Sequence, residues 1–244
     1  MGTSITPTGF EHAAAALRYW TRRQEVVANN LANVDTDGFK GERTFAQLLA
    51  DVAGPVAGTA TDLREGTLTM TGQPLDLAMG AHGFFVVDTA AGQRLSRGGP
   101  FAMDPEGRLM DARGHLVLGE DPSNAGRALP VSIPVHTAKI EIGRDGEVKA
   151  DGKVVARLRV ERPAEGATLE HAGDTLFAAS TTVRIANEDR QVRQGARESS
   201  NVHPLEALVD MITVQRATGS VQKALTTLDA ARGIAVSELG KSAQ

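Results

Sequence analysis

The 244-residue sequence contains no cysteine, which excludes disulfide bonds, thiolate metal sites and a thiol nucleophile together. Aromatic residues are scarce as well, with one Trp, one Tyr and seven Phe, so the core must be built mainly from Val, Leu, Ile and Ala. No window approaches the roughly 18 consecutive apolar residues of a membrane span. The first residues lack a basic start followed by a continuous apolar run, so we expect no cleaved signal peptide.

A strong excess of one charge is also missing. The formal net charge is −4, from 26 Lys and Arg against 30 Asp and Glu, and the two signs are interspersed. Nothing therefore marks a polyanion-binding face, and nucleic acid is not an expected partner. The apolar content of 41% is ordinary, and 26 Gly with 10 Pro predict many turns. The length allows one large or two modest domains.

Motifs that carry catalysis or bind cofactors are missing too. Ser96 lacks the first glycine of a nucleophile elbow, and no Gly-Lys-Ser or Gly-Lys-Thr phosphate loop occurs. The histidines contain no pair at a spacing of three or four residues, which would place two metal ligands on one helical face. We interpret each as a surface or turn residue: His12, His82, His115, His136, His171 and His203. The sequence predicts no enzyme, no metal site, no cofactor and no small-molecule substrate.

What the sequence does contain is a heptad pattern over residues 8–34, typical of a helix that packs along another helix. Apolar positions recur every seven residues in two interleaved series. These series are Phe10, Leu17, Gln24 and Leu31, and Ala13, Trp20, Val27 and Val34. Four heptads make a rod of roughly 40 Å at 1.5 Å per residue. A seam of this length requires an apolar partner.

The C-terminal region supplies a second apolar helix face, beginning at Pro204. Its members lie three or four residues apart: Leu205, Leu208, Met211, Ile212, Val214, Val221, Leu225 and Leu228. Pro204 suits a first helical turn, and Asn201 lies close enough upstream to cap it. Two helices packed on one globular core would explain the pattern. A coiled-coil-like pairing of the two terminal helices, carrying an interaction surface, is the alternative that we develop.

Between the terminal helices the helical period is lost. Residues 42–51 predict a short helix with Phe45, Leu48 and Leu49 on its apolar side, and residues 52–61 predict a linker or flexible loop. From about residue 66 to 195, short apolar runs alternate with turn residues. The candidate strands are 75–79, 84–88, 93–96, 116–118, 139–142, 148–150, 154–161 and 175–178.

Two Asp-Gly pairs, at 145–146 and 151–152, predict hairpins that join residues 140–148 and 148–155. Residues 190–200 are polar and end just before the second terminal helix. We therefore expect an α+β fold in which a mainly antiparallel β-domain is inserted between two helices that meet. The predicted division is a helical assembly domain (1–40 plus 199–244), an extended connection (41–74) and a β-rich domain (75–198).

Polar residues within or beside the predicted seams allow two interpretations. Asn29, Asn30 and Asn33 are weak helix formers, and Gln24 occupies a seam position. One interpretation is a fraying helix end with satisfied amides. The other is that buried amides fix helix register and partner choice. Gln215 and Gln222, seven residues apart in the second helix, leave the same alternatives open.

The sequence Ala-Asn-Asn-Leu-Ala-Asn-Val-Asp-Thr-Asp-Gly-Phe-Lys at 28–40 resembles the N-terminal signature of bacterial flagellar basal-body rod and hook proteins. Gly-Gln-Pro-Leu-Asp-Leu-Ala at 72–78, Gly-Phe-Phe-Val-Val at 83–87 and Arg-Gly-Gly-Pro-Phe at 97–101 are similar to the start of the β-domain in the rod members. These motifs place the resemblance in both the first helix and the β-rich region.

The C-terminal region carries the resemblance further. Ser-Asn-Val-His-Pro-Leu-Glu at 200–206, with Met211-Ile212 and Gln-Arg-Ala at 215–217, is similar to the C-terminal helix of the same family. Thr218-Gly219 departs from the aromatic-acidic pair that often follows Gln-Arg-Ala, and Gly219 weakens a helix by about 1 kcal/mol relative to Ala. The resemblance thus spans nearly the whole chain. The departure at Thr218-Gly219 concerns only the packing of one helical turn.

The resemblance implies a structural subunit of the periplasm-spanning rod, which transmits torque as a drive shaft. It implies assembly with copies of itself and with other rod proteins, and export through the flagellar type III apparatus without a cleaved signal peptide. Proximal rod members are most similar, and distal rod or hook-type members follow closely. The competing class is a periplasmic or secreted β-domain that binds a ligand such as glycan on an aromatic platform, for which Phe84 and Phe85 are the clustered pair.

We assign the assembly interface to the residues that combine the seam with the resembling motifs. They are Leu17, Gln24, Val27, Asn29, Asn30, Leu31, Asn33, Val34, Gly38, Phe39, Asn201, Val202, Pro204, Leu205, Leu208, Met211, Ile212, Gln215 and Arg216. We also expect an outer apolar side, including Val26, Val209 and Val214, to stay available to neighbouring subunits. Gly38 is expected to take the left-handed backbone conformation that ends the first helix.

Overall fold

The structure is a computed structural model that describes residues 9–48, 55–80, 83–121, 124–173 and 175–242. The chain divides into two compact units. The helical unit is formed within Met1–Ala32, Glu42–Ala60 and His203–Gln244, and the β unit within Asn33–Gly41 and Thr61–Val202. The chain therefore passes between the units four times, and each unit is described separately below.

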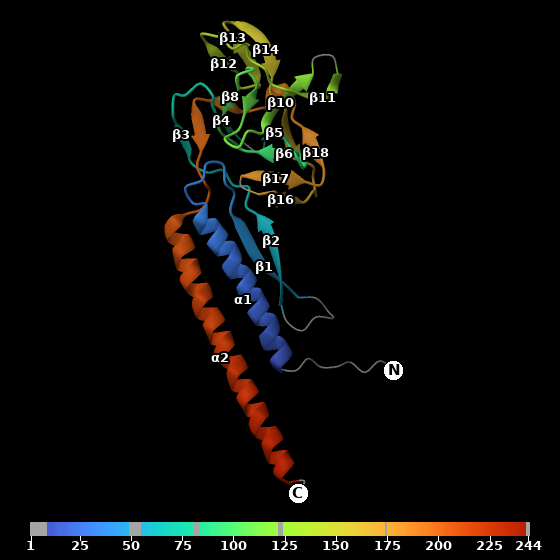
Figure 1. Cartoon of the computed structure of the whole chain (residues 1–244), viewed down its shortest axis with the longest axis vertical. Helices are drawn as coiled ribbons and strands as arrows, with labels where there is room; N and C mark the ends of the chain where they lie inside the picture. The colour runs from blue at the N-terminus through green and yellow to red at the C-terminus, as the bar shows by residue number, and fades with distance from the viewer. Residues whose placement is uncertain (1–8, 49–54, 81–82, 122–123, 174, 243–244) are drawn as a thin grey trace. The chain divides into compact units, whose positions relative to one another are not determined.

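Two long helices dominate the helical unit. Helix α1 (Gly9–Ala32) and helix α2 (Pro204–Ser242) lie side by side (Figure 1), and the Arg232 guanidinium lies 5.6 Å from the centre of the Phe10 ring. The prediction of two terminal helices is confirmed, including the start of α2 at Pro204. Strands β1 (Glu42–Leu48) and β2 (Pro55–Thr61) pair with each other, and β1 also contacts α1. Neither described helix has the length and apolar content needed to cross a membrane.

The predicted seam of α1 is largely covered. Phe10 is 42% exposed, but the remaining seam residues of α1 are half-buried or buried. A second covered stripe includes Ala15 and Val26, and Val26 is only 3% exposed. One turn after Val26, Asn30 bonds to the backbone of β1, so this stripe faces the β1–β2 pair. The expectation that Val26 stays available to neighbours is therefore wrong.

Helix α2 presents two separate apolar stripes instead of one broad face. The covered stripe alternates spacings of four and three: Ala207, Met211, Val214, Thr218, Val221 and Leu225 are half-buried or buried. Val214 is fully buried, so the expectation that it faces neighbouring subunits is wrong. Val209, in contrast, is exposed as expected. Spacings that alternate between four and three residues stay close to the 3.6 residues of one helical turn, so these side chains form one narrow line along the helix. The other apolar residues of α2 therefore lie on a separate line.

The segment after α1 corrects two further predictions. Residues 42–48 form strand β1, so the short helix expected over 42–51 is wrong. Residues 55–61 form strand β2, so the linker expected over 52–61 is wrong for that part, and 49–54 lie outside the described residues. A Cβ on Gly58 would lie 2.4 Å from the ring of Phe45. Gly58 therefore leaves room for the aromatic ring across the paired strand, and this pairing overrides the local helical preference.

The β unit is built from short strands (Figure 1). Its largest sheet has the strand order β16-β17-β6-β5-β10-β9-β8. These strands are β5 (Phe84–Thr89), β6 (Gly92–Ser96), β8 (Ala102–Met103), β9 (Leu109–Met110), β10 (Leu116–Asp121), β16 (Leu169–His171) and β17 (Leu176–Ala179). Attached to it are β11 (Asn124–Pro130), β15 (Val160–Pro163) and β18 (Thr182–Arg184). The pairings of β5 with β6, β10 and β15 are antiparallel. The α+β class with a mainly antiparallel β region is thus confirmed.

Smaller sheets complete the β unit. Strands β12 (Ile140–Ile142), β13 (Glu147–Ala150) and β14 (Lys153–Arg157) form the two hairpins predicted from the Asp-Gly pairs. Strand β4 (Asp76–Met79) lies between β7 (Gly98–Pro100) and β19 (Val192–Gln194), and β3 (Leu68–Met70) pairs with β20 (Ala196–Glu198). A 3-10 turn spans Asn187–Asp189.

Most predicted strands match observed ones, but one predicted strand is divided and several observed strands were not predicted, among them β3, β7, β8, β9, β11, β16 and β18. The strand expected over 154–161 is divided, because β14 ends at Arg157 and β15 begins at Val160. The polar stretch 190–200 was not predicted as strand, yet it contains β19 and β20. Its polar side chains hid the pattern because some of them are buried in ion pairs, as Glu198 is.

The core of the β unit lies on both faces of the central strand β5. Phe85 and Val87 belong to one apolar cluster with Leu77, Val117 and Val160, among others. Phe84 and Val86 belong to a second cluster with Leu95, Leu118 and Phe177. Because side chains alternate along a strand, a doubly covered strand buries consecutive apolar residues. Phe84 and Phe85 are both buried and form no exposed aromatic platform.

Candidate functional site

The exposed apolar surface of the helical unit is concentrated near the start of α2. Leu205 is 75% exposed, Leu208 47%, Val209 56% and Ile212 50%. We call these four residues the α2 apolar stripe. Their spacing of three, four and seven residues places them along one side of the helix. Such a row of large apolar side chains favours contact with another molecule, because covering it removes apolar area from water.

The remaining assembly residues predicted on α2 differ in their surroundings. Met211 is half-buried in the covered stripe, whereas Pro204, Gln215 and Arg216 are exposed. Gln222 is exposed as well, so neither glutamine of α2 is a buried amide within the subunit. Any contribution of Gln215 to register would have to come from contact with another molecule.

The polar residues near the end of α1 have defined local roles. The Asn30 amide nitrogen donates to the Glu42 carbonyl at 2.8 Å, and the Glu42 N–H donates to the Asn30 amide oxygen at 2.9 Å. Asn30 therefore fixes the start of β1 and supports the interpretation of a satisfied amide. In the loop that follows, the Thr36 hydroxyl donates to the Asn33 amide oxygen at 3.3 Å. Gln24, Leu17 and Leu31 are half-buried, Val27 is buried and Asn29 is exposed.

The loop after α1 is built into the β unit. Gly38 has a φ of 72°, which confirms the expected left-handed conformation, but α1 ends at Ala32, so the expectation that Gly38 ends this helix is wrong. The Gly38 N–H donates to the Glu198 carbonyl at 2.6 Å. Phe39 is buried and stacks on the His171 ring at a centroid distance of 5.3 Å. His171 also packs against Phe177 at 4.7 Å, so its interpretation as a surface or turn residue is wrong. Its imidazole is amphipathic and fills the space between two aromatic rings.

Three charged side chains are buried together in the β unit, and sequence reasoning missed them. We call Lys40, Arg97 and Glu198 the ionic junction. The Lys40 ammonium lies 2.6 Å from Glu198 Oε1, and Arg97 Nε lies 2.9 Å from Glu198 Oε2. All three side chains are about 1% exposed. Burial lowers the pKa of Lys40, and the hydrogen bond with Glu198 opposes this shift.

Backbone groups complete the coordination of the ionic junction. Lys40 also donates to the Arg64 carbonyl at 2.6 Å, and the Gly66 N–H donates to Glu198 Oε1 at 2.8 Å. The Arg97 guanidinium lies 5.4 Å from the centre of the Phe84 ring. The only sequence signal was that Lys40 and Arg97 belong to the resembling motifs 28–40 and 97–101.

Asn201 has a different role from the predicted helix cap. Its amide oxygen accepts from the Gly41 N–H at 2.8 Å, and its amide nitrogen donates to the carbonyls of Asp62 and Arg64 at 2.7 and 3.0 Å. The cap prediction is therefore wrong, because this amide joins the segments that flank the ionic junction. Val202 and Val34 are half-buried in the same unit.

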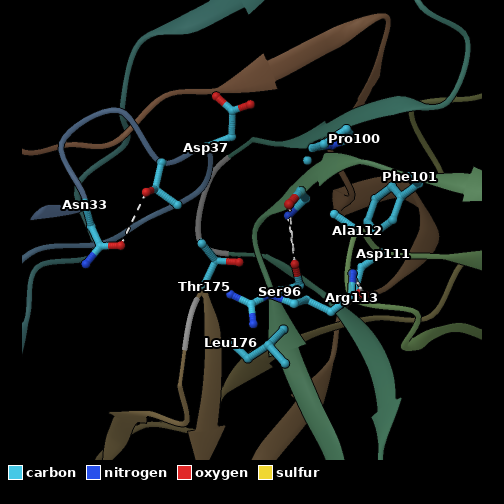
Figure 2. Close-up of a pocket in the computed structure, with 13 residues that line it drawn as sticks. Asn33, Asp37, Ser96, Pro100, Phe101, Asp111, Ala112, Arg113, Thr175 and Leu176 are labelled. Carbon is cyan, nitrogen blue, oxygen red and sulfur yellow. Dashed lines mark hydrogen bonds between the residues drawn. The ribbon is translucent and has the colours of Figure 1, made fainter.

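A pocket of about 320 Å³ lies in the β unit (Figure 2). It is lined by the loop after α1, by the chain between β6 and β8, by the turn at 111–113 and by Thr175 and Leu176. Its polar groups bond to their own neighbours. The Asp37 carboxylate pairs with Arg197 at 2.9 Å, and Asp111 accepts the N–H groups of Arg113 and His115 at 2.8 and 2.9 Å. No group of three His, Asp or Glu side chains arranged for a metal ion is present within the described ranges.

Three segments of the sequence match known protein families. Residues 10–40 match the family described as flagella basal body rod protein, and residues 78–150 match the flagellar hook protein FlgE/F/G D1 domain. Residues 193–237 match the flagellar basal body rod FlgEFG protein C-terminal family. Each matched segment contributes one member of the ionic junction. The chain belongs to the flagellar basal-body rod protein family.

Among individual relatives, those named FlgF are prominent. The chain is 33% identical to flagellar basal-body rod protein FlgF of Caulobacter vibrioides over 233 residues, covering 90% of this chain and 93% of the relative. It is 31% identical to FlgF of Salmonella typhimurium over 250 residues, covering 91% and 94%. FlgG of Bacillus subtilis is 28% identical over 250 residues, covering 88% and 92%. The chain is thus a homologue of FlgF and a structural subunit rather than an enzyme.

Proposed function

We propose that this chain is a subunit of the proximal part of the flagellar rod and transmits torque within the periplasm-spanning drive shaft. The observation that carries the proposal is the α2 apolar stripe, which leaves four large apolar residues in water on a helix of the matching family. A shaft under torque requires apolar contacts between neighbouring helices in a single register. The stripe offers such contacts to copies of this chain and to other rod proteins.

The terminal helices form a coiled-coil-like pair in this proposal. The support is the alternation of four and three residues in the covered stripe of α2, together with the covered heptad positions of α1. This pair, within 1–40 plus 199–244, is the assembly domain, residues 41–74 connect it, and residues 75–198 form the β-rich domain. In this scheme the assembly contacts come from the exposed residues of the predicted set, with the α2 apolar stripe as their centre.

The remaining predicted residues support those contacts from within the subunit. Buried Phe39 and left-handed Gly38 hold the loop after α1 in one conformation, and Asn201 ties it to the segment before α2. Because the loop already has one conformation in the free subunit, fewer backbone conformations are lost when the subunit assembles. The conformational entropy cost of assembly is therefore lower.

Delivery to the rod is part of the same proposal. The chain is exported unfolded through the flagellar type III apparatus in this proposal, which its membership of the flagellar rod family supports. A distal rod or hook-type position is the second candidate, since FlgG relatives cover a similar share of the chain. A glycan-binding β-domain is not favoured, because Phe84 and Phe85 are both buried.

The test is to locate the chain in isolated basal bodies. A strain in which the gene for this chain is deleted is complemented with a tagged version of the chain. Purified basal bodies are then dissociated in steps, and the proteins released at each step are identified by mass spectrometry. We expect the tag with proximal rod components, whereas recovery only with distal rod and hook proteins would assign the second candidate. Absence of the tag from basal bodies of motile cells would refute both positions.

A further inference from the structure

The ring of Phe45 forms an aromatic surface on the outer side of strand β1. Phe45 is 45% exposed, and its ring lies over Gly58 of strand β2, where a Cβ would come within 2.4 Å of it. Side chains alternate along a strand, so Arg43 lies on the same side, and both residues are exposed whereas Glu42 and Thr44 are half-buried. We call Arg43 and Phe45 the β1 patch. A ring held against backbone loses little freedom on binding, which suits an anchor in a contact between proteins.

The α2 apolar stripe requires a partner surface different from itself, and this step rests on the proposed function. Two copies that paired stripe to stripe would form a two-fold symmetric dimer, and that contact would be closed to a third copy. A shaft that grows through the stripe requires two different surfaces to meet, because each copy then binds one neighbour through each surface. The stripe therefore meets another part of the neighbouring copy.

Outside α2, the described part of the helical unit exposes two large apolar side chains, Phe10 and Phe45. The Phe10 ring already has Arg232 of the same copy beside it, at 5.6 Å from its centre. Phe45 and the α2 apolar stripe both stay exposed, so the two surfaces do not cover each other within one copy. Phe45 is thus the large apolar side chain of this unit that is available to the stripe of a neighbour.

The charges beside the two surfaces are of opposite sign. Within residues 42–48 and 55–61, Arg43 is the exposed charged residue, and the first three turns of α2 carry Glu206 and Asp210, both exposed. Each acid directly follows a stripe residue in the sequence. Successive helical residues are about 100° apart, so both acids lie on one flank of the stripe. Opposite charges across a contact favour one orientation of the two surfaces.

We propose that the β1 patch of one copy covers the α2 apolar stripe of the next copy. Phe45 packs against Val209 and Ile212, and Arg43 faces the flank that carries Glu206 and Asp210. The contact joins two different surfaces, so it continues from copy to copy rather than closing as a dimer. It deepens the proposed function by naming the surface of the neighbour that the stripe meets.

The test uses the fact that the chain contains no cysteine, so an introduced pair is the only one in it that a thiol reagent can link. Gln47→Cys is on the exposed side of β1 and Leu208→Cys is in the stripe, and both leave Phe45 and Ile212 in place. A strain in which the gene for this chain is deleted expresses both variants with different tags, and its basal bodies are treated with a short bis-maleimide. We expect a dimer that carries both tags, and a ladder of multimers from a chain with both substitutions. If Leu208→Cys is not recovered in basal bodies, Leu205→Cys takes its place.

The matched control pairs Val183→Cys with Leu208→Cys, because Val183 is 43% exposed but belongs to the β unit, and it should give no dimer. Adding Phe45→Asp to the Gln47→Cys copy should lower the yield of the mixed dimer at least about tenfold, because it removes the anchor and brings an acid toward the acidic flank of the stripe. Phe45→Tyr keeps the ring and should leave the yield within about twofold.

Four outcomes count against the contact. Dimers formed by Leu208→Cys alone would overturn it, because the stripe would then meet itself. A dimer between Val183→Cys and Leu208→Cys would also overturn it, by placing the β unit on the stripe. Basal bodies that contain the chain but give no mixed dimer refute the contact and leave the proposed function intact. Basal bodies of motile cells that lack the chain refute the proposed function, and the contact with it.

Discussion

Ile212→Asp separates assembly from folding, because Ile212 is half-exposed while Val214, two residues later, is fully buried. Within the subunit, Ile212 has only part of its side chain covered, so replacing it with Asp should cost about 1 kcal/mol of folding free energy. Val214→Asp is the matched control, and a carboxylate without a partner at that position should cost about 3 kcal/mol or more.

The effect on assembly is expected to be larger than the effect on folding. Each residue of the α2 apolar stripe retains about half or more of its surface, and covering that surface contributes roughly 1 kcal/mol per side chain. Asp at 212 removes one such contribution and adds the desolvation of a carboxylate inside the contact. A total of about 3 kcal/mol lowers the association constant on the order of 100-fold.

The assays read the two effects independently. Far-UV circular dichroism and the fluorescence of Trp20, the single tryptophan, report the helical unit in dilute solution. Swimming in soft agar and recovery of the chain in basal bodies report assembly. Ile212→Asp should keep the parent spectra and abolish both swimming and recovery, whereas Val214→Asp should lose helical signal as well.

A motile strain carrying Ile212→Asp, with the chain recovered in its basal bodies, would refute the reasoning. So would a loss of helical signal in Ile212→Asp equal to that of Val214→Asp, because the stripe would then be part of the subunit's own core.

Further predictions follow from other parts of the molecule. In the isolated subunit, residues 26–34 and 205–221 should exchange amide hydrogens orders of magnitude faster than β5, because the uncovered stripe leaves the helices marginally stable; strong protection there in mass spectrometry would contradict this. Asn30→Ala removes two hydrogen bonds to Glu42 and should lower the thermal stability of the helical unit by about 2 kcal/mol in calorimetry. Gly66→Ala places a Cβ 1.9 Å from the Ser199 carbonyl oxygen, so urea melts should show a loss of about 2 kcal/mol or more in the β unit. Burial lowers the pKa of Lys40 in the folded chain, so the unfolded chain binds more protons at pH values between this lowered pKa and 10.5, and stability rises with pH across that interval. Lys40→Met should remove this rise in urea titrations from pH 7 to 10.

The helices and the hairpins were predictable because their signals are local. The heptads of α1 extend over several turns, and Pro204 marks the start of α2. The Asp-Gly pairs impose backbone conformations that few other residues adopt, as the φ of 81° at Gly146 and of 50° at Asp151 illustrates. Each of these signals operates within a few residues and survives without knowledge of the rest of the chain.

The segments that sequence reasoning missed depend on distant partners. Strand β1 contains Glu, Arg and Gln, which favour a helix locally, and it becomes a strand by pairing with β2. The ionic junction joins positions separated by up to 158 residues, and no spacing rule links them. Helix α2 was predicted with one apolar face, because the sequence cannot say which of two adjacent stripes α1 will cover.

The helical unit is formed by segments that are far apart in the sequence, and this affects which molecules can join an assembly. Helices α1 and α2 come from opposite ends of the polypeptide, so a molecule that is cut or terminated early lacks the second half of its own pairing surface. In the assembly that we propose, such a fragment cannot present the side chains near residue 210 to a growing filament. Incomplete copies would thereby be excluded because they lack the contact surface.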